Sequence, residues 1–82
     1  MLMVERIMAE RVLDASGLRC PMPLLKTKLE LNGMSAGERL QVIATDAGSS
    51  RDIPAWVDMS AHALISQSED HGEYRFVIEC GG

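Results

Sequence analysis

The sequence has few of the features that mark the common classes of small protein. Of its 82 residues only 4 % are aromatic, two are cysteine, and no run of basic residues occurs. Two cysteines are too few for a disulfide framework, and the scarcity of aromatics argues against a surface on which nucleic-acid bases stack. No apolar stretch approaches the ~20 residues that span a membrane. The residues before Arg11 mix charged and apolar types, unlike a signal peptide. We therefore expect a protein of the reducing cytoplasm.

The balance of charge favours protein partners. The formal net charge is −4 at pH 7 and the isoelectric point is near 5.0. Proteins that bind nucleic acid directly have a basic surface. We therefore expect no direct nucleic-acid binding and no membrane partner, and a protein partner with a basic face fits better.

The hydrophobic pattern predicts an α+β fold. Strands are expected at residues 11–15, 40–45, 63–68 and 74–79, and helices at 21–32 and 51–61, with Pro54 in the first turn of the second helix. The order β-α-β-α-β-β predicts a two-layer sandwich, a four-stranded mixed sheet with two helices on one face. Residues 1–10 read as an N-terminal extension and 11–82 as a single domain.

Each predicted helix has an apolar arc that would face the sheet. In the first helix this arc holds four leucines together with Lys28, whose stem would run along the core before its amine reaches water. The leucines are Leu24, Leu25, Leu29 and Leu31. In the second helix the expected inward side chains are those of Ile53, Trp56 and Val57.

The segment LRCPMPLL places a cysteine beside two prolines. With Cys20 as the N-cap of the first helix, Pro21 occupies the first helical position, which proline favours. Pro23 is then third, and the two prolines remove two of the four N–H groups that a helix leaves free at this end. The N–H groups of Cys20 and Met22 remain. Met22 also precedes a proline, so the helix could instead begin nearer Pro23.

This helix end suits one sulfur better than a phosphate. A phosphate cradle needs several convergent N–H groups, whereas a thiolate or persulfide needs one donor and the positive end of the helix dipole. Arg19 would add positive potential. The alternative is a small buried cysteine and prolines that only start a helix. A metal site is disfavoured, because no CxxC occurs and both histidines, His62 and His71, are distant in sequence.

Two segments together resemble the TusA/SirA-like sulfur-carrier family. They are LDASGLRCPMPLLKTK, with a Cys-Pro-x-Pro motif, and ATDAGSSRDIPAW, with an Arg-Asp-Ile-Pro motif. The resemblance extends from Val12 to Gly82. It implies a fold similar to the C-terminal domain of translation initiation factor 3. It also implies a sulfurtransferase that accepts sulfane sulfur as a persulfide on Cys20 and needs no metal or organic cofactor.

The resemblance also implies partners and further site residues. The sulfur donor would be a cysteine desulfurase or a rhodanese-like protein. The acceptor would be a protein of tRNA 2-thiolation, molybdenum-cofactor formation or sulfur oxidation. Pro21 and Pro23 carry over as motif positions, with Met22 between them. Arg51 and Asp52 match the second motif, and Asp52 would at least favour a helix N-terminus. Leu18 and Met22, where exposed, are candidate docking residues.

Three alternatives stay open. Cys80 has no counterpart in the family pattern, so it is either a second thiol that resolves a persulfide or a residue without a role in sulfur transfer. The chain could be a non-catalytic regulatory or interaction module of the same fold. The ending Gly81-Gly82 also occurs in ubiquitin-like carriers that hold sulfur as a C-terminal thiocarboxylate, but those folds begin with a β-hairpin rather than a strand followed by a helix.

Overall fold

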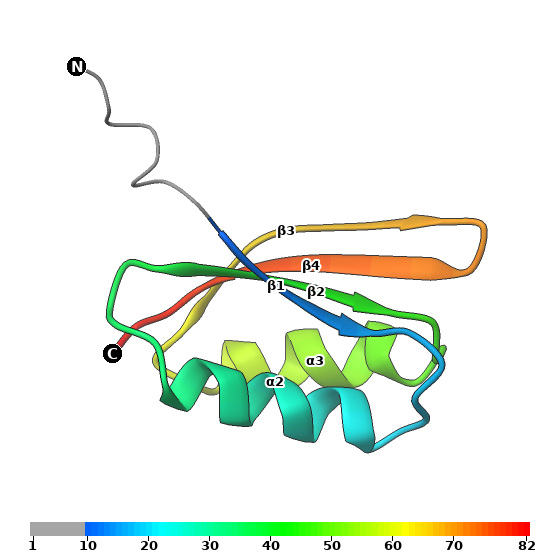
Figure 1. The fold of residues 1–82 in the computed structure, drawn as a ribbon, viewed down its shortest axis with the longest axis horizontal. Helices are drawn as coiled ribbons and strands as arrows, with labels where there is room; N and C mark the ends of the chain where they lie inside the picture. Colours follow the sequence, from blue (N-terminus) through cyan, green and yellow to red (C-terminus); the bar gives the residue numbers. More distant parts are fainter. Residues whose placement is uncertain (1–9) are drawn as a thin grey trace.

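The computed structural model describes residues 10–82, in which two helices cover one face of a four-stranded sheet (Figure 1). The elements are β1 (Arg11–Ala15), α2 (Met22–Asn32), β2 (Arg39–Ala44), α3 (Ser49–Asp58), β3 (Ala63–Asp70) and β4 (Glu73–Glu79). The predicted fold class and element order are confirmed. The likeness to the translation initiation factor domain stays a prediction. The predicted N-terminal extension lies outside the described residues, Glu10 excepted.

The sheet is mixed and has the strand order β1-β2-β4-β3. β1 pairs with β2 in parallel, and β2–β4 and β4–β3 are antiparallel pairs. A parallel pair requires a crossover connection, which α2 supplies between β1 and β2. The hairpin of β3 and β4 turns at His71 and Gly72, whose φ angles of 50° and 79° are the left-handed values that a tight two-residue hairpin turn requires.

The core lies between the sheet and the two helices. β2 alternates as a half-buried strand should, with Leu40, Val42 and Ala44 fully buried. Phe76 and Ile78 of β4 are buried on the same face, opposite Val42 and Leu40 respectively. The helices contribute the remaining large buried side chains, those of Leu31, Ile53 and Val57.

The prediction for the buried face of α2 was wrong in part. Leu31 is buried, but Leu25 and Leu29 have exposed fractions of 44 % and 71 %. Pro23 and Thr27 are buried in their place, at a spacing of four residues that leads on to Leu31. Thr27 can occupy a core position because its hydroxyl donates to the carbonyl of Pro23 at 2.8 Å, which satisfies the buried oxygen.

Lys28 lies within the apolar arc of α2, and its charged group is accommodated by an aromatic ring. Its Nζ lies 5.4 Å from the centre of the Trp56 ring on α3. The side chain is half-buried, and its ammonium group ends over an aromatic face, where a cation is attracted.

Helix α3 begins and ends earlier than predicted. It spans Ser49–Asp58 rather than residues 51–61, and Pro54 lies inside the helix, beyond the first turn. The early start follows from a turn that runs into the helix, because the N–H groups of Ser49 and Ser50 donate to the carbonyls of Asp46 and Ala47. In the part of the chain that the structure describes, no helix is long and apolar enough to cross a membrane.

Candidate functional site

The site lies where two loops meet at the carboxyl ends of the parallel strands β1 and β2. The strands end in register, Ala15 beside Ala44, so the two loops start side by side. The N–H of Gly17 in the first loop donates to Oγ1 of Thr45 in the second at 2.9 Å. The first loop continues to Cys20 and α2, and the second to α3. The fold thus brings the two sequence motifs together.

Helix α2 starts later than the interpretation of Cys20 as its N-cap requires. Pro21 is the N-cap, Met22 is the first helical residue and Pro23 is the second, and the Cys20–Pro21 peptide bond is cis. The N–H of Met22 donates to the carbonyl of Arg19 at 2.8 Å and closes a turn around the cysteine. Of the two helix starts that the sequence left open, the structure has the later one, with Pro21 rather than Cys20 as N-cap, and the Met22 N–H is bonded to backbone.

The thiol of Cys20 is exposed and bonds to a carboxylate. Its Sγ donates to Oδ2 of Asp52 at 3.1 Å, across 32 residues of sequence. Asp52 lies in the first turn of α3, at a helix N-terminus as expected. Its contact with the sulfur was not expected from the sequence. Arg19 and Arg51 are both exposed beside the site.

The surroundings of Cys20 favour the protonated thiol. The hydrogen bond to Asp52 raises the pKa of Cys20, and partial loss of hydration and the charges of Asp52 and Asp46 raise it further. The charge of Arg51 acts in the opposite direction and does not outweigh them. The sequence had led us to expect a thiolate stabilised by a helix end and by Arg19, whereas the structure has a thiol held by a carboxylate.

A second carboxylate lies close to the same sulfur. Oδ2 of Asp46 is buried and has no hydrogen-bond partner within residues 10–82. Gly48 lies close to both this oxygen and the sulfur. A Cβ atom on Gly48 would stand 2.9 Å from Asp46 Oδ2 and 3.7 Å from Cys20 Sγ. With a φ of −62°, the backbone of Gly48 would accept any residue, so the reason for a glycine here is space.

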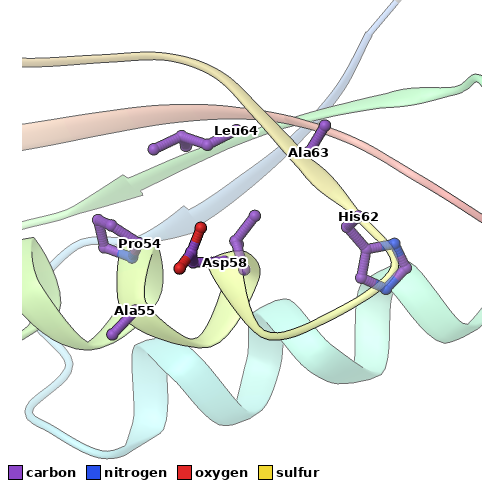
Figure 2. A pocket seen from close by; sticks show the side chains of 7 residues that line it. Pro54, Ala55, Asp58, His62, Ala63 and Leu64 are labelled. Carbon is purple, nitrogen blue, oxygen red and sulfur yellow. The ribbon is translucent and has the colours of Figure 1, made fainter.

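The histidines and the second cysteine do not join the site. His62 accepts the N–H of Gly81 at Nδ1, and His71 lies beside Asp70 in the hairpin turn. Cys80 is buried in the core. An open cavity of about 550 Å³ between α3 and β3 is lined by seven side chains, Asp58 and His62 among them, and does not include Cys20 (Figure 2). Within residues 10–82, no three His, Cys, Asp or Glu side chains group as metal ligands.

A family profile described as Sulfurtransferase TusA matches residues 11–80. The chain belongs to the TusA family. It is 44 % identical over 70 residues to the sulfur carrier protein TusA of Allochromatium vinosum, covering 85 % of this chain and 92 % of the relative. It is 40 % identical over 73 residues to YrkI of Bacillus subtilis, which carries the provisional name of a sulfur carrier protein, covering 89 % and 97 %.

A solved structure has the same fold. The SirA-like protein of Desulfitobacterium hafniense superposes with a TM-score of 0.73 at 22 % identity, covering 87 % of this chain and 97 % of the other. The predicted resemblance to TusA and SirA-like proteins is confirmed. Membership of the TusA family supports a role in sulfur transfer between a donor and an acceptor.

Sequence reasoning missed two residues that the fold places beside Cys20. Asp46 and Gly48 both lie in the segment ATDAGSSRDIPAW, where the sequence alone indicates only a loop and a helix cap. Their position in the sequence could have indicated a role, because both follow directly after a buried strand. The parallel neighbour of that strand leads to the cysteine, and functional sites in parallel sheets form at such strand ends.

Proposed function

We propose that this TusA-family protein carries sulfur as a persulfide on Cys20. The observation that carries the proposal is the exposed thiol of Cys20 bonded to Asp52, which joins the Cys-Pro-x-Pro motif to the Arg-Asp-Ile-Pro motif. A nucleophilic thiol has to meet a partner's sulfur at the surface. Of the two cysteines of the chain only Cys20 is exposed.

Loading is an exchange between a thiol and a persulfide. The sulfur of Cys20, as its thiolate, attacks the outer sulfur of a donor persulfide. A new S–S bond forms to Cys20, the S–S bond of the donor breaks, and the donor leaves as a thiolate. Asp52 accepts the proton of Cys20, and the donor thiolate takes up one proton. The sulfane sulfur moves without net oxidation or reduction.

Unloading is the same exchange in reverse. The thiolate of an acceptor attacks the outer sulfur on Cys20, and Cys20 leaves as a thiolate. The raised pKa of Cys20 means that its thiolate recovers a proton readily, and the proton that the acceptor thiol releases reaches it through Asp52, 3.1 Å away. One carboxylate thus serves both half-reactions, as proton acceptor in the first and proton donor in the second.

The partners we propose are a cysteine desulfurase or rhodanese-like donor and an acceptor protein of tRNA 2-thiolation, molybdenum-cofactor formation or sulfur oxidation. An exposed apolar stripe begins beside Cys20 and supports contact with such partners. Met22, Leu25 and Leu29 of α2 follow at spacings of three and four, and their exposed fractions are 41 %, 44 % and 71 %. Of the two expected docking residues, Met22 is exposed and Leu18 is half-buried.

The test is sulfur transfer from a cysteine desulfurase in the presence of cysteine, read by intact mass. We expect the wild-type protein and the Cys80→Ser variant to gain one sulfur atom, and the Cys20→Ser variant to gain none. Sulfur that stays on the protein after Cys20→Ser, and is lost on reduction, would place the carrier atom elsewhere and overturn the proposal.

A further inference from the structure

The two carboxylates beside Cys20 are not equivalent. Asp52 already accepts the thiol proton at 3.1 Å. Asp46 Oδ2 is buried with no partner among the described residues, although a buried carboxylate oxygen without a hydrogen bond is costly. Such an atom in a native fold calls for a reason, and a group that is present only in one state of the reaction is one.

The geometry over Gly48 relates this oxygen to the sulfur. The point where a Gly48 Cβ would stand is 2.9 Å from Asp46 Oδ2 and 3.7 Å from Cys20 Sγ. Sγ and Oδ2 are therefore separated by no more than the sum of these two lengths. An S–S bond adds about 2.05 Å to the reach of the side chain. A sulfur bonded to Sγ and directed over Gly48 therefore lies at most about 4.6 Å from Asp46 Oδ2, so it approaches an oxygen that the thiol itself does not contact.

We propose that Asp46 is the partner of the outer sulfur, and that in the persulfide of Cys20 the outer S–H donates to Asp46 Oδ2 across Gly48. The inference rests on the proposed persulfide on Cys20. Gly48 is the residue that leaves room for this contact, because a Cβ atom here would stand 2.9 Å from Asp46 Oδ2 and 3.7 Å from Cys20 Sγ.

The consequence is the direction in which the sulfur reacts. A protonated persulfide offers an electrophilic outer sulfur to a thiolate, whereas an ionised persulfide carries the charge on that sulfur and repels the thiolate. The negative charge of Asp46 favours the protonated form, as a nearby like charge does for any acid. In unloading, the acceptor sulfur forms its bond to the outer sulfur, the Cys20 S–S bond breaks, and the proton travels with the transferred sulfur or returns to Asp46.

The experiment loads the full chain chemically with inorganic polysulfide, which needs only the Cys20 thiol and no partner protein. Transfer from the loaded protein to a small thiol is then measured from pH 6 to 9 for the wild type, Asp46→Asn and the matched control Asp58→Asn, an exposed carboxylate farther along α3. We expect the pH above which transfer declines to fall by about one unit in Asp46→Asn. The control should follow the wild type.

The outcomes separate the two proposals. Asp46→Asn that loads fully and transfers with the wild-type pH profile would overturn the role of Asp46 and leave Cys20 as the carrier. Wild-type protein that loads with polysulfide but never from a donor protein would count against the proposed function alone. Because Asp46 Oδ2 has no hydrogen-bond partner within residues 10–82, we expect Asp46→Asn to fold with a Tm no lower than that of the wild type.

A second variant does not depend on the charge of Asp46. Gly48→Ala places a methyl group 2.9 Å from Asp46 Oδ2, a contact that forces that carboxylate aside. We expect the Cys20 thiol of this variant to remain accessible to alkylation, and the transfer profile to shift in the same direction as in Asp46→Asn. A Gly48→Ala protein whose persulfide transfers as the wild type does would contradict the path over Gly48.

Discussion

Cys20 and Cys80 lie at opposite ends of helix α2. Cys20 precedes its first residue by two positions, while the sulfur of Cys80 lies 3.7 Å and 3.6 Å from the carbonyl oxygens of Leu31 and Met34 at its other end. The helix has 11 residues and is thus about 16 Å long. A disulfide requires Cα atoms within about 7 Å of each other. Cys80 is therefore a core residue and cannot resolve a persulfide on Cys20 within one folded chain.

This separation predicts different reactivities for the two thiols. Cys80 is 2 % exposed, so iodoacetamide should modify one cysteine in the native protein and both only in denaturant. Cys80→Ala should accept sulfur like the wild type and lose about 1 kcal/mol in the free energy of unfolding, because it leaves a small void in the core. Mass spectrometry and urea unfolding measure the two effects. An intramolecular disulfide after mild oxidation of the native protein would contradict the prediction.

The bond between Cys20 and Asp52 predicts a pH dependence with a definite sign. Asp52 raises the pKa of Cys20, so Asp52→Asn should lower it and increase the thiolate fraction at neutral pH. The rate of alkylation at pH 7 should therefore rise about threefold to tenfold, and the midpoint of the pH–rate curve should move down. Asp58→Asn, on the same helix, is the matched control. A midpoint that rises or stays in place would mean that the hydrogen bond to Asp52 does not set the acidity.

The order of strands and helices could be predicted from sequence because it rests on local patterns. Leu40, Val42 and Ala44 alternate along β2, and the alternation alone identifies a half-buried strand. The buried face of α2 could not be predicted in the same way. Thr27 is polar, so a hydrophobic pattern places it outside the core. Only the hydrogen bond from its hydroxyl to the carbonyl of Pro23 shows how the core accommodates it.

The chemistry of the site was predictable only in its parts. The motif cysteine and the Arg-Asp-Ile-Pro segment are visible in the sequence, but the contact between Cys20 and Asp52 depends on loops that meet at the ends of β1 and β2. The predicted thiolate followed from counting N–H groups at a helix end. The structure favours the thiol instead, because the turn at Arg19 uses the Met22 N–H and because the Asp52 and Asp46 carboxylates, from another part of the chain, raise the pKa of Cys20.

Gly81, near the C-terminus, has no room for a side chain, which predicts a clear difference in stability between two glycine variants. A Cβ atom on Gly81 would meet the carbonyl oxygen and carbon of Ala61 at separations that no side chain tolerates. Gly81 also donates its N–H to His62. Gly81→Ala should therefore cost about 1–3 kcal/mol in the free energy of unfolding. Gly33→Ala is the control, since its Cβ would make only an ordinary contact with the carbonyl of Glu30 at 3.7 Å.

Urea unfolding followed by circular dichroism would compare the two glycine variants. Equal midpoints for Gly81→Ala and Gly33→Ala would show that the close approach to Ala61 does not matter for stability. A thiocarboxylate carrier requires a free C-terminal tail that can enter a partner. Gly81 is instead held against the loop before β3, so a lower midpoint for Gly81→Ala would also count against the thiocarboxylate alternative. The first strand leading into a helix already departs from that class of carrier.

The apolar stripe on α2 predicts a variant that separates docking from chemistry. Leu29 is 71 % exposed and lies about two turns of helix from Met22, so Leu29→Glu should change the free energy of unfolding by no more than about 0.5 kcal/mol. It should slow sulfur loading from a donor protein by about tenfold, as loss of one apolar contact of an interface does. Loading by inorganic polysulfide should be unchanged, because the small donor needs only the thiol.

Met59→Glu, 81 % exposed at the far end of α3, is the matched control and should load normally from both donors. Equal loading of Leu29→Glu and Met59→Glu by the donor protein would remove α2 from the docking surface and leave the chemistry at Cys20 untouched.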